Sequence, residues 1–230
     1  MVLTTFFLLH LEKMNKKSKN YGILFALFIL PLVFYILVST GINNFGKLAI
    51  VTPKVLDISE IDSAKTTIFK DKISIVCFLG DDMQSVKGGI FNLNQKIYKP
   101  FYGFVDFQIV AIYPKDKEKE MNILKKEIGG FTDMEKWKFV AASKEKIILF
   151  YKSFKTENTL KNAYTPKAFI IDREGNLRGR LDDDDIEGGK LFGYNMHSVA
   201  ELNNKMKDDV KVLLAEYRLA LKKNGAKRKI

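Results

Sequence analysis

The amino-acid sequence predicts an α/β domain with a central mixed sheet and flanking helices, preceded by one N-terminal transmembrane helix. Three features indicate this. Short β-branched runs alternate with amphipathic stretches over residues 72–154, which is typical of parallel strands joined by helices. Two more apolar runs flank the turn sequence Asp-Arg-Glu-Gly-Asn at 172–176, which favours a β-hairpin. An uncharged apolar run at 21–38 precedes them all.

The apolar run reads YGILFALFILPLVFYILV and is about as long as a bilayer core requires. Four lysines between residues 13 and 19 precede it, and a basic cluster before a span favours a cytoplasmic N-terminus. The exit sequence Val-Ser-Thr-Gly is a poor match to a signal-peptide cleavage site, and no cysteine follows as a lipoprotein would need. We therefore expect an uncleaved single-pass anchor in the inner membrane, with the rest of the chain on the exported, periplasmic side.

This prediction divides the chain into five parts. They are a cytoplasmic N-terminus at 1–20, the anchor at 21–40, a linker and N-terminal extension at 41–71, the α/β domain at 72–222, and a basic tail at 223–230. Met14 is an alternative start, because MNKKSKN already forms a complete basic N-terminus.

Each element of the domain has its own local signal. The runs at 72–79 and 107–113 are rich in Ile and Val and end at Gly80 and Pro114, so both are predicted to be buried strands. Apolar residues recur at helical spacing between and after these strands, and Gly-Gly ends the second helix. The remaining predictions are strands at 137–141, 167–171 and 177–181, and helices at 86–98, 117–128, 144–154 and 199–221.

Charge and cysteine content exclude two classes of protein. The net charge is +11, but it lies mostly before the apolar run and at the C-terminus, which leaves the middle of the chain close to neutral. Basic termini of this kind indicate membrane topology or a solvated tail, so we expect no nucleic-acid partner. Cys77 is the only cysteine, so no intrachain disulfide can form.

One segment resembles a known family. Residues 164–177 read YTPKAFIIDREGNL: a Thr-Pro pair, an apolar strand, Asp-x-x-Gly and a second strand. This resembles the sequence around the cis-proline of thioredoxins, which membrane-anchored thioredoxins share with the Sco/SenC copper chaperones. The N-terminal anchor and the final helix DDVKVLLAEY resemble the Sco/SenC branch. The resemblance implies a thioredoxin-like fold over about 72–221, a cis peptide bond at Pro166, and a role in respiratory oxidase assembly.

The sequence departs from that family where its chemistry lies. The loop after the first core strand contains C-x-x-C or C-x-x-x-C in the family, and here residues 80–87 read GDDMQSVK. Thiol–disulfide exchange needs both an attacking and a resolving sulfur. The histidine that provides the third copper ligand of Sco proteins is also missing from Ala-Tyr-Thr at 163–165. We therefore expect a redox-inactive protein that is not an enzyme.

Cys77 lies inside the predicted strand at 72–79, not in the loop after it. A free cysteine in such a strand most often packs as a small hydrophobic residue, and no basic neighbour in the sequence would lower its pKa. A single-cysteine thiol enzyme is the alternative interpretation.

The thioredoxin order predicts that three separate segments meet at one end of the sheet, where α/β proteins form binding surfaces. The predicted binding face consists of Asp81, Asp82, Thr165, Pro166, Asp182, Asp183, Asp184 and Asp185. Met83 and His197 are candidate copper ligands on the same face, because thioether and imidazole groups bind copper. The plain alternatives are that Met83 fills a gap, that His197 and Ser198 cap the last helix, and that the four aspartates form a solvated loop.

The sequence thus predicts a binding or assembly module, tethered to the membrane, with no cofactor. Its predicted partner is another membrane or exported protein, and the acidic run would suit a basic one. A copper chaperone with an altered Met/His site is the first alternative, and a single-cysteine thiol enzyme the second.

Overall fold

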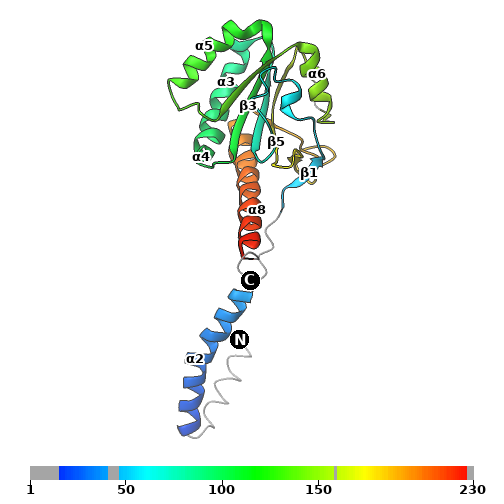
Figure 1. Ribbon diagram of the computed structural model, residues 1–230. Coiled ribbons are helices and arrows are strands. Elements are labelled where there is room, and N and C mark those ends of the chain that lie inside the picture. Colours follow the sequence, from blue (N-terminus) through cyan, green and yellow to red (C-terminus); the bar gives the residue numbers. More distant parts are fainter. Residues whose placement is uncertain (1–15, 41–46, 158–159, 227–230) are drawn as a thin grey trace. The chain divides into compact units, whose positions relative to one another are not determined.

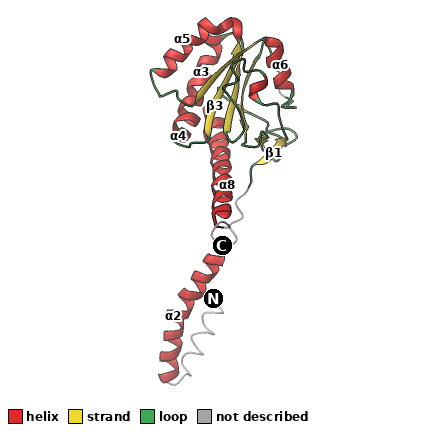
Figure 2. Cartoon of the chain, in the orientation of Figure 1, coloured by secondary structure: helices red, strands yellow, loops and turns green. Residues whose placement is uncertain are grey.

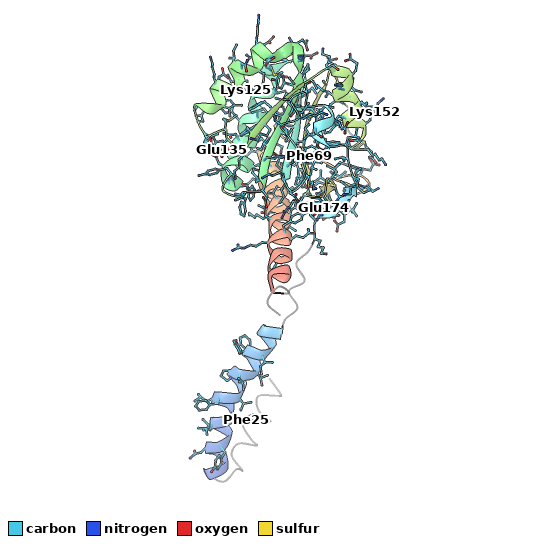
Figure 3. All side chains as sticks on the ribbon, viewed as in Figure 1. Phe25, Phe69, Lys125, Glu135, Lys152 and Glu174 are labelled. Carbon is cyan, nitrogen blue, oxygen red and sulfur yellow. The ribbon has the colours of Figure 1, made fainter. Side chains whose placement is uncertain are left out.

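The computed structural model describes residues 16–40, 47–157 and 160–226 of the chain, which forms two compact units, Met1–Phe45 and Gly46–Ile230. The first unit contains helix α2 (Lys16–Thr40), with Pro31 inside it and exposed apolar side chains such as Phe25 (Figure 3). Among the described residues, no helix combines the length and the apolar character needed to cross a membrane. The alternative start at Met14 and the end of the predicted tail at 227–230 lie outside the described residues.

The second unit is a sheet covered by helices (Figures 1 and 2). In chain order its elements are β1 (Ala49–Thr52), η1 (Ile58–Glu60), β2 (Ile73–Leu79), α3 (Met83–Leu93), η2 (Asn94–Tyr98), α4 (Lys99–Phe101), β3 (Phe107–Pro114), η3 (Lys115–Lys117), α5 (Glu118–Gly129), β4 (Trp137–Ala142), α6 (Lys144–Lys152), β5 (Tyr164–Ile171), β6 (Leu177–Gly179), β7 (Tyr194–Asn195), α7 (Val199–Glu201), η4 (Leu202–Met206) and α8 (Lys207–Ala226). The η elements are short 3₁₀ or π-helical turns.

The sheet has the order β1-β6-β5-β2-β3-β4, and β7 also pairs with β5. Strands β2, β3 and β4 are parallel, whereas β5 runs antiparallel to β2 and β6 antiparallel to β5. The predicted change from a parallel to an antiparallel sheet is therefore confirmed. This mixed sheet with flanking helices is a thioredoxin-like α/β fold.

Alternate residues of the central strand β2 face two separate cores, because successive side chains of a strand point to opposite faces. Ile75 and Cys77 belong to the core on the side of α3, α5 and α8. Val76 and Phe78 belong to the core on the side of α6, which is rich in aromatic residues and includes Phe69 (Figure 3). The β-branched run therefore forms a strand that is buried on both faces.

Two strands were not predicted. Residues 49–52, which the sequence placed in an extension, form β1 and pair with β6 at the edge of the sheet. Tyr194 and Asn195 form β7 by pairing with Ala168 and Lys167 of β5. Both strands are too short to show a period of their own, and their hydrogen bonds come from partners far away in the sequence.

The hairpin turn at 172–176 is attached to the last helix through buried charges. Arg178 donates to Asp172 Oδ2 at 3.0 Å and to Glu216 Oε2 of α8 at 2.5 Å. Asp172 is completely buried and also accepts from the backbone and side chain of Asn176. These contacts attach α8 to the antiparallel half of the sheet.

Candidate functional site

The loop after β2 is shaped by Gly80. Its φ of +64° is in the left-handed region, and a Cβ atom on it would lie 2.4 Å from Cβ of Tyr164. Only glycine avoids this overlap, because it has no Cβ atom. The loop can therefore pass close to the start of β5. The Asp81–Asp82 sequence is thereby held beside Tyr164.

Asp82 caps the N-terminus of α3. Its Oδ1 accepts from the backbone N–H groups of Gln84 and Ser85 at 3.1 and 3.2 Å. An aspartate at this position satisfies two free donors and complements the positive end of the helix. In this chain the helix end that could stabilise a thiolate is therefore occupied by the protein's own carboxylate.

Asp81 joins the loop to α6. Its Oδ2 accepts from Nζ of Lys144 at 2.7 Å, and this hydrogen bond raises the pKa of Lys144. Its other oxygen, Oδ1, is buried and has no hydrogen-bond partner. Asp81 is therefore held in place through Lys144, and its second carboxylate oxygen is shielded from solvent.

A pocket of about 210 Å³ opens beside this loop, between α3 and α5. Apolar atoms of Met83, Ile123 and Leu124 line part of it, and the remaining lining residues are Asp81, Asp82, Gln84, Lys87, Glu120 and Glu127. Four of these residues are acidic and one is basic. We call this cavity the acidic pocket.

Two ion pairs border the acidic pocket. Lys87 of α3 contacts Glu127 of α5 at 2.6 Å, and Lys117 contacts Glu120 at 3.4 Å. All four side chains are between 29% and 47% exposed, and pairs of this kind contribute at most about 1 kcal/mol. An incoming cation could therefore replace either lysine at small cost.

Tyr164 and His197 form the other side of the face. The Tyr164 hydroxyl and His197 Nε2 are 2.9 Å apart, and the backbone N–H of Met196 donates to the carbonyl of Pro166 at 2.8 Å. Burial raises the pKa of Tyr164, and the charge of Asp82 adds to this. The hydroxyl is therefore a neutral hydrogen-bonding group, not a phenolate.

The expected cis peptide bond at Pro166 is wrong, because the described backbone contains no cis bond. The turn before β5 is made by Asn162 and Ala163, whose φ angles are +50° and +60°. Lys161 and Tyr164 exchange two backbone hydrogen bonds across it, so the chain is already extended when it reaches the proline. Thr165, which was placed on the binding face, is 1% exposed and does not reach the surface.

Cys77 is buried in β2, as the sequence indicated. The residue is completely inaccessible, and its neighbours across the sheet are Ala111 and Ala168. Burial raises the pKa of the Cys77 thiol far above its ordinary value. Its only polar contact within the described residues is a long one, 3.7 Å to the carbonyl of Val110. Both low exposure and a high pKa work against thiolate chemistry.

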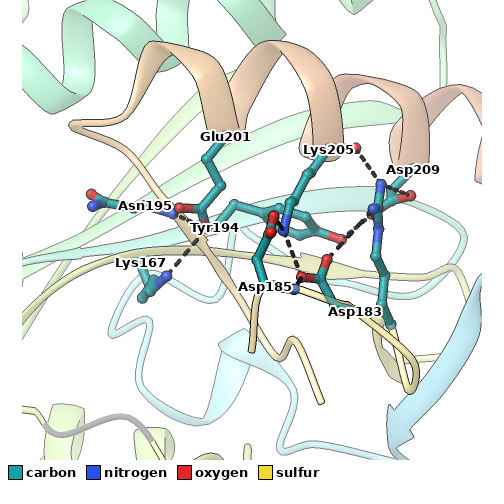
Figure 4. A network of polar contacts seen from close by, with 9 residues as sticks. Lys167, Asp183, Asp185, Tyr194, Asn195, Glu201, Lys205 and Asp209 are labelled. Carbon is teal, nitrogen blue, oxygen red and sulfur yellow. Dashed lines mark hydrogen bonds and ion pairs between the residues drawn. The ribbon is translucent and has the colours of Figure 1, made fainter. Parts of the chain in front are cut away.

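The acidic run is divided by the fold (Figure 4). Asp183 is buried and contacts Nζ of Lys205 at 2.5 Å and Arg180 at 3.5 Å. Asp185 contacts the same ammonium at 2.7 Å, while Asp182 and Asp184 are exposed. The run is therefore neither a fully solvated loop nor four free carboxylates, because two of its members are neutralised from within the domain. Asp183 and Asp185 contact Arg180, which follows β6, and Lys205 of η4, and neither lines the acidic pocket.

Arg180 extends this network to β7. It donates to both carboxylate oxygens of Asp209 at 2.8 and 3.0 Å, and the buried Tyr194 hydroxyl donates to Asp209 at 2.6 Å (Figure 4). Nearby, Glu201 accepts from the backbone N–H of Asn195. These bonds fix the segment that ends in Met196 and His197 against the last helices.

The network predicts an acid-sensitive contribution from Asp183. Burial alone would raise its pKa, but Lys205, the N–H of Asp185 and Arg180 together lower it. A lowered pKa stabilises the fold above the unfolded value of about 3.9, and this stability is lost as the pH falls through the folded pKa. At pH 7, Asp183→Asn should lower the free energy of unfolding by about 1–3 kcal/mol. Urea unfolding should show the difference shrinking below about pH 4.

The exposed neighbour Asp184 is the matched control for that experiment. Asp184→Asn should change the free energy of unfolding by less than about 0.5 kcal/mol at either pH. Equal effects of the two substitutions at pH 7 would mean that the Lys205 contact does not stabilise the fold.

The candidate copper ligands have different surroundings. Met83 lines the acidic pocket, whereas His197 contacts Tyr164 and lies over Gly89, two turns along α3. A Cβ on Gly89 would be 3.2 Å from the His197 ring, so this glycine allows the approach. Within the described residues no cluster of three or more His, Cys, Asp or Glu side chains could hold a metal ion. Ser198 caps the last helical segment by accepting from Glu201 N, as the plain alternative predicted.

The sequence did not point to Glu120, Glu127 or Lys144. Glu120 and Glu127 are seven residues apart on one predicted helix, and that spacing places them on the same helix face. This signal could have found them. Lys144 had no local signal, because its contact with Asp81 joins residues 63 positions apart.

Comparison with known proteins gives structural matches only. No family model matches the chain, and no curated protein does. The solved structures to which it is similar are thioredoxin-like and include BsSco, a member of the Sco family of cytochrome c oxidase assembly proteins (14% identity, 71% of this chain and 95% of that one, TM-score 0.48). They also include a Sco/SenC family lipoprotein from Bacillus anthracis (17%, 71% and 96%, 0.48).

A third match is the thioredoxin domain of a thiol-disulfide oxidoreductase from Bacteroides vulgatus (16% identity, 73% of this chain and 98% of that one, TM-score 0.40). Likeness at these identities does not say which chemistry the chains share.

Proposed function

We propose that this protein is a redox-inactive binding module that uses the acidic pocket to hold a basic side chain of a partner protein. The pocket is the observation on which the proposal rests. It opens beside the Asp81–Asp82 loop, at the helix end where the family that the sequence resembles has its cysteines. The burial of Cys77 supports a function in binding over one in thiol exchange.

The lining of the pocket fits a lysine or arginine side chain. Such side chains place an aliphatic stem on apolar surface and a charged head against acceptors. Met83, Ile123 and Leu124 offer the apolar surface, and Ile123 is 60% exposed. The carboxylates of Glu120 and Glu127, which are 47% and 38% exposed, are acceptors for the head group.

The tether and location remain part of the proposal. They rest on the sequence, namely the uncharged run at 21–38 and the lysines before it. We place the module on the exported side of the inner membrane. The named function of BsSco suggests the class of partner, a subunit of a membrane-bound oxidase during assembly. A basic exported or membrane protein of another kind would fit the pocket equally well.

The proposal is tested by measuring whether peptide binding depends on the negative charge of the acidic pocket. We expect the full chain in neutral detergent to bind a dye-labelled arginine-containing peptide, and not the same peptide with glutamate in place of arginine. Glu120→Gln combined with Glu127→Gln should weaken binding about tenfold, because two exposed charge contacts are lost. Fluorescence anisotropy of the labelled peptide measures both.

Two control variants separate the pocket from general charge. Glu145→Gln on α6 removes a carboxylate outside the pocket and should leave the affinity unchanged. Ile123→Ser should weaken binding more than Leu149→Ser, although the two side chains are 60% and 63% exposed. If the glutamate peptide binds as well as the arginine peptide, the proposed ligand class is wrong.

A further inference from the structure

We infer that residues 102–105 dock the domain on an anionic lipid surface. This loop, Tyr-Gly-Phe-Val, joins α4 to β3 and is exposed throughout. Tyr102, Phe104 and Val105 are 54%, 45% and 79% exposed, which brings three large apolar side chains together in four residues. Aromatic and aliphatic side chains of this kind are favourable at the boundary between lipid head groups and acyl chains.

Contacts with the neighbouring residues of the domain fix the conformation of this loop. The ring of Tyr102 packs against Tyr98, and that of Phe104 against Phe101, with centroids 6.1 and 6.3 Å apart. The backbone N–H of Phe107 also donates to the carbonyl of Phe104 at 3.2 Å. An apolar tip with a fixed conformation loses little entropy when it enters the interface.

Two ammonium groups contact the backbone of the apolar tip. Lys136 Nζ donates to the carbonyl of Phe104 at 2.5 Å, and Lys72 Nζ donates to the carbonyl of Val105 at 3.3 Å. The adjacent residue Asp106 is shared between Lys72 and Arg173 at 4.0 and 3.7 Å, so its charge is compensated. Ammonium groups beside an apolar tip favour a surface that is both apolar and anionic.

The loop shares its end of the domain with β1 and the end of α8. In Figure 1, α4, β1 and the C-terminal end of α8 all lie at the same end of the domain. The last nine residues of α8, 218–226, include three basic and no acidic residues. Only residues 39–48 separate the apolar run from β1, and ten extended residues reach at most about 35 Å.

The lipid occupant rests on the tether in the proposed function, but not on the acidic pocket. The pocket adjoins the carboxyl end of β2, whereas the 102–105 loop precedes β3 at the opposite end of the parallel strands. A domain docked through this loop would leave the pocket open to a partner.

The test uses the full chain with a fluorophore at the tip. Val105→Cys can be labelled selectively with a polarity-sensitive NBD group, because Cys77 is inaccessible. The labelled chain is placed singly in lipid nanodiscs of phosphatidylcholine, alone or with phosphatidylglycerol. In the anionic discs we expect a blue-shifted emission that doxyl-labelled lipids quench. Lys136, for which the described residues show no ion pair, should raise the ratio of docked to free domain about fivefold over neutral discs.

Several comparisons make the result decisive. The same label at Leu149→Cys, 63% exposed on α6, should not be quenched. Lys72→Gln with Lys136→Gln, or about 0.5 M salt, should remove the difference between the discs. Equal quenching at 105 and 149 would overturn the inference.

Other outcomes also overturn it. An emission change that depends on the number of chains per disc, and not on lipid charge, would assign the loop to a second copy of the chain. A change that needs an added protein would assign it to a protein partner. Absence of quenching while the chain stays in the disc would reject docking and leave the tether intact. Loss of the chain from the disc would reject the tether itself.

Discussion

Cys77 in the folded protein should react with iodoacetamide at neutral pH at least about 10³-fold more slowly than in the unfolded chain, because alkylation must wait for the sheet to open. The sulfur has no exposed surface, and burial raises the pKa of its thiol. The reagent therefore cannot reach the sulfur, and the thiol does not ionise at neutral pH. The measurement is the rate of mass increase of the intact chain, in buffer and in guanidinium chloride.

The control for this experiment is a second cysteine in an exposed position. Leu149→Cys should take up one equivalent at the rate of a free peptide, while Cys77 in the same molecule stays unmodified. Reaction of Cys77 at that same rate would restore the single-cysteine enzyme as a serious hypothesis. It would also show that β2 opens readily, which the two-sided burial of this strand argues against.

Arg178→Met should produce the largest loss of stability among the substitutions considered, about 3 kcal/mol, because it leaves the buried carboxylate of Asp172 without its charged partner. Asp172 would keep its hydrogen bonds from Asn176, which places the effect at the lower end of the range for broken buried pairs. The substitution also removes the contact with Glu216 that attaches α8 to the sheet. Urea unfolding followed by circular dichroism measures the change.

Arg173→Met is the matched control, since it makes the same change five residues earlier in the same hairpin. Arg173 has only longer contacts, at 3.8 Å to Asp71 and 3.7 Å to Asp106, and lies 5.3 Å from the centroid of the Tyr217 ring. Its loss should cost less than about 1 kcal/mol. If Arg178→Met with Asp172→Asn is as unstable as Arg178→Met alone, the unpaired buried charge is not the cause.

The order of the elements could be predicted because each has a local signal. The Ile- and Val-rich run became β2, and the turn at 172–176 became the hairpin between β5 and β6. Ser143 caps α6 by accepting from the N–H of Lys146. Propensity and periodicity act over a few residues, so they suffice where a few residues decide the structure.

The predicted site was recovered only in part. The sheet does bring Met196 and His197 beside Pro166, because β7 pairs with the first half of β5. Thr165 is buried instead of exposed. The sequence presented Asp183 as one of four equivalent aspartates, but the fold buries it against Lys205, 22 residues away. A run of like charges shows composition, and it does not show which member has a partner.

The sequence by itself determined that a chain with one cysteine cannot form an intrachain disulfide. It also determined the succession of strands and helices, because covalent composition and local periodicity need no tertiary contact. Only the tertiary structure decided which carboxylates line the acidic pocket. It also decided that Asn162 and Ala163 make the turn before β5, without a cis proline, and that Lys72 and Lys136 contact the apolar loop at 102–105. Each of these depends on atoms brought together from distant parts of the chain, such as Asp81 and Lys144, and through-space distances are not readable from spacing along the sequence.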